Sequence, residues 1–110
     1  MTAIVRTLVS DLIRPDGRES RIALRHDGAD VSYGALHETC RAFARSLLAL
    51  KLARGERVAV YLDKRIETVV GMFGAAAAGL VFVPVNPLLK GEQVGHILRD
   101  CNVRVLVTSD

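Results

Sequence analysis

The chain has 110 residues, of which 50% are hydrophobic and 25% are charged, so it can bury the core of one domain or of part of one. Its formal net charge is +3, but the basic residues are scattered beside acidic ones and there is no tryptophan to stack on bases, which argues against a nucleic-acid surface. The longest apolar stretch, Met72 to Val85, contains two glycines and a proline and falls short of the roughly 20 residues that a membrane span needs. Arg6 and Asp11 interrupt the apolar N-terminal positions, so we expect no signal peptide and a cytoplasmic location.

The first residues predict a helix followed by a short hairpin. Apolar residues recur at helical spacing until residues 14–17 break the pattern; they are Ile4, Val5, Leu8, Val9, Leu12 and Ile13. Arg21 to Arg25 and Val31 to Tyr33 then predict two strands of a hairpin. Asp27 and Gly28 lie between the strands and are residue types that tolerate a positive φ, as a tight turn requires.

A second helix is expected after the hairpin. Ser32 is its predicted N-cap, and residues 53–55, Ala-Arg-Gly, are expected to end it. Its apolar face is made by Leu36, Cys40, Phe43, Ala44, Leu47 and Leu48. Residues 1–56 thus form the N-terminal part of the predicted domain.

Residues 57–110 predict a βαβαβ unit with a parallel sheet. Val58 to Leu62 is an apolar run typical of a buried strand, and the helix Ile66 to Ala78 follows it. We expect this helix to place Phe73 against the sheet, because one helical face carries Ile66, Val69, Val70, Phe73, Gly74 and Ala77. Gly79 is expected to end the helix with a positive φ.

The second half of this unit repeats the pattern. The run from Gly79 to Pro84 predicts a strand buried on both faces, which proline then ends. An amphipathic helix marked by Val94, Ile97, Leu98 and Cys101 leads to a last strand, Val103 to Val107. Parallel neighbours need crossovers of this length, so the segment predicts one half or edge of an open α/β sheet.

The residue types that usually carry chemistry are better explained by structure. Cys40 and Cys101 lie on apolar helix faces without a ligand partner nearby in sequence, so we expect buried, reduced thiols. Residues 74–79 have the two-glycine frame of a phosphate loop, but Leu80 and Val81 replace the lysine and hydroxyl residue that contact phosphate. The histidines lie in separate predicted elements and are expected at the surface: His26, His37 and His96. We predict no catalytic residue and no metal ligand in the chain.

Two segments carry a resemblance to a known family. Val31 to Leu36 resembles the first core motif of the adenylate-forming enzymes, with Ala35 where glutamate is usual. Ala78 to Pro87 resembles the second, with Phe82 for the common tyrosine and Asn86 for the aspartate typical of amino-acid-activating members. This family includes AMP-forming acyl-CoA synthetases, luciferases and peptide-synthetase adenylation domains, and the Asn-Pro pair favours an acyl-CoA ligase.

The resemblance implies a parent enzyme of which this chain is the N-terminal part. Such a ligase uses ATP and Mg²⁺ to convert a carboxylic acid to an acyl-adenylate and then transfers the acyl group to coenzyme A, as in fatty acid metabolism. In that family the ATP-binding loop and the catalytic residues lie beyond the position of Asp110, so we expect a single partial domain that acts as a scaffold and is inactive alone. The alternative is a stand-alone flavodoxin-like binding or interaction module without enzymatic activity.

Ligands of open α/β sheets bind at the carboxyl ends of the strands. In this chain these ends are residues 63–64, 86–90 and 108–110. Lys90 stands where some acyl-CoA ligases carry a basic residue near the coenzyme A nucleotide, and the resemblance therefore implies a cofactor contact there; the alternative is a solvated lysine in a turn. Asn86 is expected to bond to the backbone of its own turn.

The end of the predicted sheet also suggests self-association. A parallel sheet that ends after Val103 to Val107 exposes unpaired backbone groups along an apolar edge, and such edges recruit partners. We expect a homodimer or a higher assembly, formed by edge pairing or by exchange of the N-terminal helix.

Overall fold

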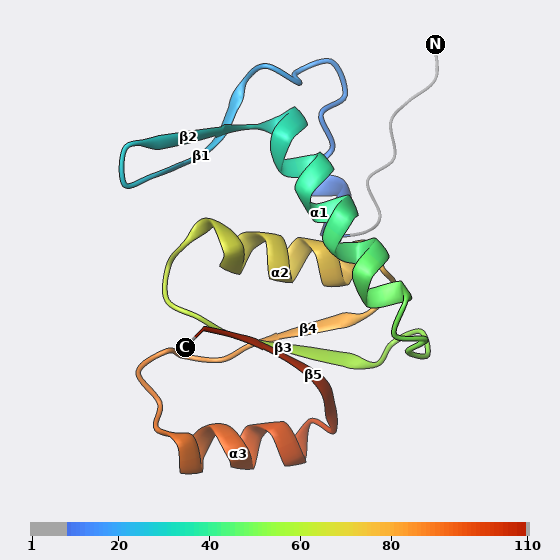
Figure 1. The fold of residues 1–110 in the computed structure, drawn as a ribbon, viewed down its shortest axis with the longest axis vertical. Helices are drawn as coiled ribbons and strands as arrows, with labels where there is room; N and C mark the ends of the chain where they lie inside the picture. The colour runs from blue at the N-terminus through green and yellow to red at the C-terminus, as the bar shows by residue number, and fades with distance from the viewer. Residues whose placement is uncertain (1–8, 110) are drawn as a thin grey trace.

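The computed structural model describes residues 9–109 of the chain. Its elements are layered, with α1 over α2, α2 over a parallel sheet, and α3 on the opposite face of that sheet (Figure 1). This arrangement confirms the predicted α/β fold. In chain order the elements are η1 (Val9–Ile13), β1 (Ile22–His26), β2 (Ala29–Ser32), α1 (Tyr33–Leu48), β3 (Arg57–Tyr61), α2 (Ile66–Ala77), β4 (Val81–Pro84), α3 (Gly91–Asp100) and β5 (Val103–Thr108).

The parallel sheet has three strands in the order β4-β3-β5, so β3 lies in the middle. Val58, Ala59 and Val60 of β3 are at most 2% exposed. The prediction of a strand buried on both faces at Gly79 to Pro84 was wrong, because β4 lies at an edge of the described sheet and Val81 is 48% exposed. Only a strand that is paired on both sides and covered by helices above and below becomes fully buried, and β3 meets both conditions.

The hairpin and the start of α1 follow local sequence chemistry. Asp27 and Gly28 form a two-residue turn with φ values of 49° and 78°, between the paired residues His26 and Ala29. The strands therefore reach closer to the turn than predicted. Ser32 caps α1 as expected, since its Oγ accepts a hydrogen bond of 3.1 Å from the backbone N–H of Ala35.

Two expectations about the first half of the chain change. Helix α1 ends at Leu48 and not near residues 53–55, because the backbone turns away at Lys51, which has a φ of 58°. Of the predicted N-terminal helix, only Val9–Ile13 is described, and it forms a short 3₁₀ helix. Ile4, Val5 and Leu8 lie outside the described residues.

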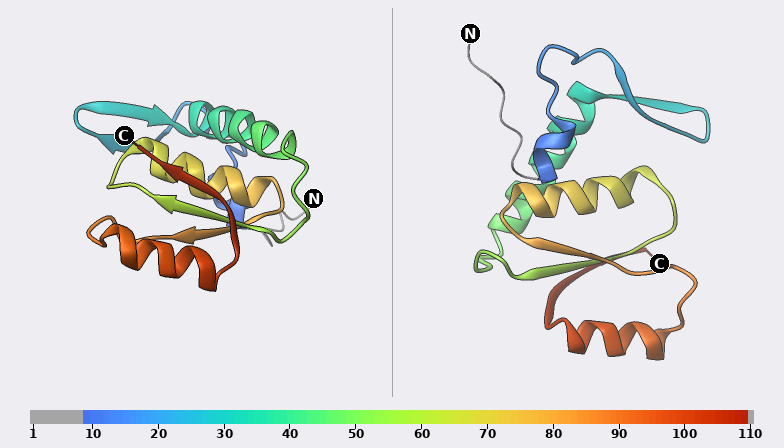
Figure 2. Two further views of the ribbon diagram at one scale, coloured as in Figure 1. Left: turned by 60° about the horizontal axis from the view of Figure 1, so that its bottom comes forward. Right: turned by 180° about the vertical axis from the view of Figure 1, so that it is seen from behind.

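Helix α2 is enclosed between the sheet and α1, as the views in Figure 2 show. Phe73 packs with Leu36 and Cys40 on the α1 side, so the expectation that it faces the sheet was wrong. The sheet side of α2 instead carries Gly71, whose neighbours include Val60, and Ala75, which packs in one cluster with Leu47, Val58 and Leu80. A helix covered on both sides is apolar on both sides, so its sequence does not show which face meets the sheet.

The two cysteines differ in burial. Cys40 is 1% exposed, and burial raises the pKa of its thiol to about 11, so the thiol is protonated at neutral pH. Cys101 is only half-buried, because it caps the C-terminal end of α3 and does not lie on its inner face. Both cysteines are free thiols. No helix among residues 9–109 is long and apolar enough to cross a membrane.

Candidate functional site at the carboxyl edge of the sheet

Three chain segments leave the sheet at the same edge, on the left of Figure 1. The register pairs Val60 of β3 with Pro84 of β4 and Tyr61 with Thr108 of β5, so these strands end at the same level. The segments that follow are residues 62–65, 85–90 and 109. This edge is where open α/β sheets bind their ligands.

The β3–α2 loop is held by its own side chains. The guanidinium Nε of Arg65 donates to the carboxylate of Asp63, and the hydroxyl of Thr68 donates to the backbone carbonyl of Asp63 at 2.6 Å. The hydrogen bond from Arg65 is the main reason that the pKa of Asp63 lies below its ordinary value of 3.8. The side chains of Asp63 and Arg65 are partly exposed to solvent, so this loop presents charged groups that are held in place by hydrogen bonds.

We expect the Asp63–Arg65 contact to give the fold an acid-sensitive increment of stability. Because the pKa of Asp63 is lowered in the folded state, the increment is present above the ordinary pKa of 3.8 and is lost as the pH falls through the folded value. Asp63→Asn should therefore lower the urea midpoint at neutral pH and match the wild type in strong acid. Arg65→Gln should produce the same change. If Asp63→Asn had its full effect in an Arg65→Gln background, the contact would not be the cause.

The β4–α3 loop is held in the same way. The side-chain oxygen of Asn86 accepts a hydrogen bond of 2.9 Å from the backbone N–H of Leu88, which confirms that Asn86 serves its own turn. The hydroxyl of Tyr61 donates to the backbone carbonyl of Leu89 and so ties this loop to the end of β3. Tyr61 and its contact were not predicted, because they join residues 28 positions apart.

Lys90 follows this loop and is the last residue before α3. Its backbone N–H donates to the side-chain oxygen of Gln93 at 3.1 Å, which orients the start of the helix. Its side chain is exposed and forms no ion pair with the residues that the structure describes. Lys90 is the N-cap residue of α3, and the helix dipole favours an anion at this end of the helix.

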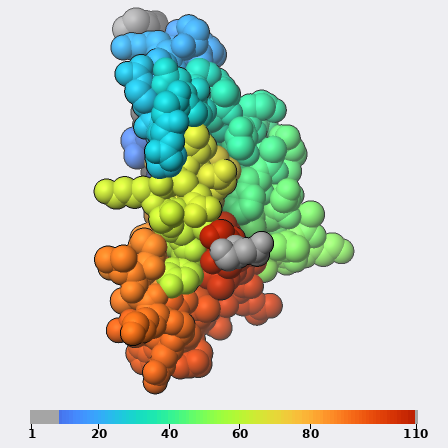
Figure 3. Space-filling model, turned by 60° about the vertical axis from the view of Figure 1, so that its left-hand side comes forward, coloured from blue at the N-terminus to red at the C-terminus, as the bar shows by residue number. Residues whose placement is uncertain are grey.

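Arg65 lines a hollow of about 220 Å³ beside β1 and two larger hollows at this edge. One, of about 400 Å³, lies between α2 and the end of β5 and is lined mainly by apolar residues, with Leu62, Gly71 and Val107 among them. The other, of about 510 Å³, lies between the β3–α2 loop and the hairpin turn at His26. Figure 3 views this edge, with the β3–α2 loop in yellow between the hairpin and the β4–α3 loop. Arg65 was not predicted from the sequence; its place in the loop that follows a buried strand was the available signal.

The edge thus combines cations with a few carboxylates. Lys64, Arg65 and Lys90 supply positive charge, and Asp63 and Glu67 supply negative charge. Among residues 9–109, no three histidine, cysteine or acidic side chains are grouped so that they could hold a metal ion. The histidines of the chain lie apart, since His26 is on β1, His37 on α1 and His96 on α3. The arrangement suits contact with an anionic group of a ligand.

Known proteins share this sequence and fold. The AMP-binding enzyme family matches residues 14–110. Phosphinothricin tripeptide synthetase PhsB of Streptomyces viridochromogenes is 38% identical over 88 residues, which are 79% of this chain and 7% of that protein. Crotonobetaine/carnitine–CoA ligase of Salmonella enteritidis PT4 is 38% identical over 78 residues, which are 71% of this chain and 15% of the ligase. The chain therefore spans a small part of the length of the curated relatives it matches.

A solved structure agrees with these relatives. The N-terminal subdomain of Klebsiella oxytoca NpsA, in complex with 3-hydroxyanthranilyl-AMSN, superposes with a TM-score of 0.86 at 28% sequence identity. The match covers 94% of this chain and 27% of that one, so the βαβαβ unit and the hairpin correspond to part of a larger subdomain. The sequence match and the shared fold together show that this chain belongs to the AMP-binding, adenylate-forming enzyme family and represents a partial domain of it.

Proposed function

We propose that the chain is the N-terminal segment of an acyl-CoA ligase, an enzyme that activates a carboxylic acid with ATP and Mg²⁺ and passes the acyl group to coenzyme A. The observation that carries this proposal is Asn86, an uncharged amide whose side chain is engaged in its own turn at a position where amino-acid-activating members carry aspartate. The similarity to a crotonobetaine/carnitine–CoA ligase supports the same choice. In this proposal the enzyme acts in the cytoplasm, in fatty acid or related carboxylic acid metabolism.

The segment itself is proposed to be a scaffold. Residues 1–56 and 57–110 form one partial domain, whose partner is the rest of the enzyme, and its proposed direct contact is Lys90 with the coenzyme A nucleotide. Lys90 supports this role because its exposed, positively charged side chain and the positive end of the α3 dipole both attract phosphate groups. Homodimerisation through the open edge of β5 is a further prediction of this scaffold.

A second candidate passes the acyl group to a different acceptor. PhsB, a tripeptide synthetase, is as similar to this chain as the ligase is, at 38% identity. In that case the segment would belong to an adenylation domain that loads a carrier protein. Both candidates form an acyl-adenylate, so the acceptor thiol distinguishes them. The stand-alone flavodoxin-like module is disfavoured, because the sequence match extends over residues 14–110 and not over the βαβ pattern alone.

The test uses the protein translated from the whole reading frame that contains this segment. We expect ATP–pyrophosphate exchange with at least one acid of a carboxylic acid panel, followed by thioester formation with coenzyme A. In that protein Lys90→Ala should raise the KM for coenzyme A roughly tenfold, the loss expected for one charge-assisted phosphate contact, and leave the KM for ATP unchanged. Lys90→Arg should restore most of the affinity.

Each other outcome has a definite meaning. Transfer of the acyl group to a carrier protein but not to coenzyme A would favour the second candidate, and absence of pyrophosphate exchange with every acid would contradict both. An unchanged KM in Lys90→Ala would identify Lys90 as a solvated turn residue. The 110-residue chain alone is the negative control, because it contains no lysine-closed phosphate loop.

A further inference from the structure

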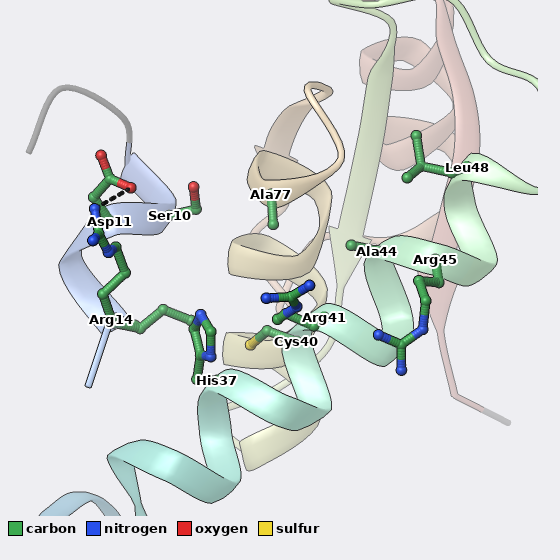
Figure 4. Close-up of a pocket in the computed structure, with 11 residues that line it drawn as sticks. Ser10, Asp11, Arg14, His37, Cys40, Arg41, Ala44, Arg45, Leu48 and Ala77 are labelled. Atoms are coloured by element: carbon green, nitrogen blue, oxygen red, sulfur yellow. Dashed lines mark ion pairs between the residues drawn. The ribbon is translucent and has the colours of Figure 1, made fainter. Parts of the chain in front are cut away.

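A groove lies on the outer side of α2, where η1 and α1 approach each other (Figure 4). Its volume is about 430 Å³, within the range of pockets that hold small organic ligands. No residue of the parallel sheet lines it, so it is separate from the carboxyl edge described above. The residues that matter for its chemistry are Ile13, Cys40, Arg41, Ala44, Arg45 and Ala77.

The floor of the groove is apolar. Ile13 is 7% exposed, Cys40 is 1% exposed and Ala44 is 6% exposed, and the protonated thiol of Cys40 behaves as a small apolar group. Ala77 completes the floor from the last turn of α2, between the η1 and α1 sides of the groove in Figure 4. An apolar body of a ligand would find contacts from three elements there.

One wall of the groove carries uncompensated positive charge. Arg14, on the η1 side, is neutralised by ion pairs with Asp11 at 3.8 Å and Asp16 at 3.4 Å. Arg41 and Arg45 are exposed on successive turns of α1 and form no ion pair with the residues that the structure describes. Like charges four residues apart on a helix repel each other, and a bound anion removes that repulsion.

Residues 1–8 contain one basic residue, Arg6, and no aspartate or glutamate. An anionic ligand would therefore find Arg41 and Arg45 without an ion-pair partner among the described residues. The planar guanidinium group favours oxygen pairs such as those of phosphate, which it binds with two parallel hydrogen bonds.

We propose that this groove binds a small organic phosphate ester, with the phosphate group on Arg41 and Arg45 and the organic body on the floor at Ile13, Cys40 and Ala77. The recognition is by chemical class: one dianionic end and one compact apolar end. It does not depend on the ligase activity, because none of the groove residues belongs to the carboxyl edge of the sheet.

Phenyl phosphate is the probe for this site, and its binding to the 110-residue chain is measured by isothermal titration calorimetry. We expect the wild type to bind phenyl phosphate more tightly than inorganic phosphate. In Arg41→Ala/Arg45→Ala, phenyl phosphate should bind at least tenfold more weakly, because both charged contacts are lost. Ala77→Trp fills the groove and should remove the preference for phenyl phosphate over inorganic phosphate.

The matched control is Arg21→Ala/Arg99→Ala, which removes two exposed arginines outside the groove. Both double variants lower the formal net charge from +3 to +1, since each loses two positive charges, so a purely electrostatic attraction would weaken equally in both. Unchanged affinity in this control, together with the loss in the groove variant, supports the site. Equal weakening in the two double variants, absence of saturable binding in the wild type, or equal affinity for the two phosphates would overturn the proposal.

Discussion

Leu36→Ala is expected to destabilise the fold by about 2 to 5 kcal/mol, the cost of removing a fully buried leucine side chain. Leu36 is 1% exposed and packs with Ile13, Cys40 and Phe73, so it joins α1 to both η1 and α2. The same cluster includes Leu24 and Val31 of the hairpin, so the truncation leaves a cavity among several packed elements. Since a small domain has only about 5 to 15 kcal/mol of stability in total, the variant should show a markedly lower urea midpoint.

Leu88→Ala is the matched control for this experiment. Leu88 is 87% exposed in the β4–α3 loop, so the same substitution there should change the free energy of unfolding by less than about 0.5 kcal/mol. Similar midpoints for the two variants would mean that α1 does not pack on α2 as the structure shows.

Gly74→Ala is expected to cost about 1 to 3 kcal/mol, although alanine is the better helix former by about 1 kcal/mol. A β-carbon at Gly74 would lie 2.6 Å from Cδ2 of Phe43 and 3.2 Å from the carbonyl oxygen of Cys40. The second contact is with backbone, so α1 must shift to accommodate the methyl group. The change is measured as a loss of melting temperature and of the free energy of unfolding in urea.

Gly71→Ala, one turn earlier in the same helix, controls for helix propensity. A β-carbon there would lie 3.4 Å from Cγ2 of Val60, which is an ordinary packing distance. This variant should be neutral or more stable than the wild type by up to about 1 kcal/mol. A stabilising effect at both glycines would show that the α1–α2 contact is looser than described.

The sequence of α2 does not show which face of the helix meets the sheet. The helix, its first residue Ile66 and its end at Gly79, which has a φ of 78°, were all predicted from local chemistry. The side that Phe73 takes was not, because α2 is apolar on both faces and its partners, α1 and β3, compete for them. Only the stacking order of the layers decides that Phe73 meets Leu36 and that Gly71 meets Val60.

The candidate sites also combine features that local sequence predicts with features that only long-range contacts create. The positions of Lys90 and Asn86 at the carboxyl edge were predicted from sequence, because a proline-ended strand followed by a helix locates a loop there. The contact of Lys90 with a cofactor stays a prediction. The hairpin turn at His26 and Arg65 line one hollow, and η1 and Arg41 line another, although the residues of each pair are about 30 to 40 positions apart in the numbering. No local pattern reports such a contact.

The sequence by itself determined the element types from the hairpin onward, the turn at Asp27 and Gly28 and the cap at Ser32, because each depends on residues within a few positions of one another. The family was recognised from two such short segments, Val31 to Leu36 and Ala78 to Pro87. The tertiary structure decided that β3 and not β4 is the buried central strand. Both are short apolar runs, and each becomes central or peripheral only through the crossover that places β5 on the far side of β3. Strand order depends on long-range pairing, and apolar runs of similar length and composition do not indicate which strand lies in the centre of the sheet.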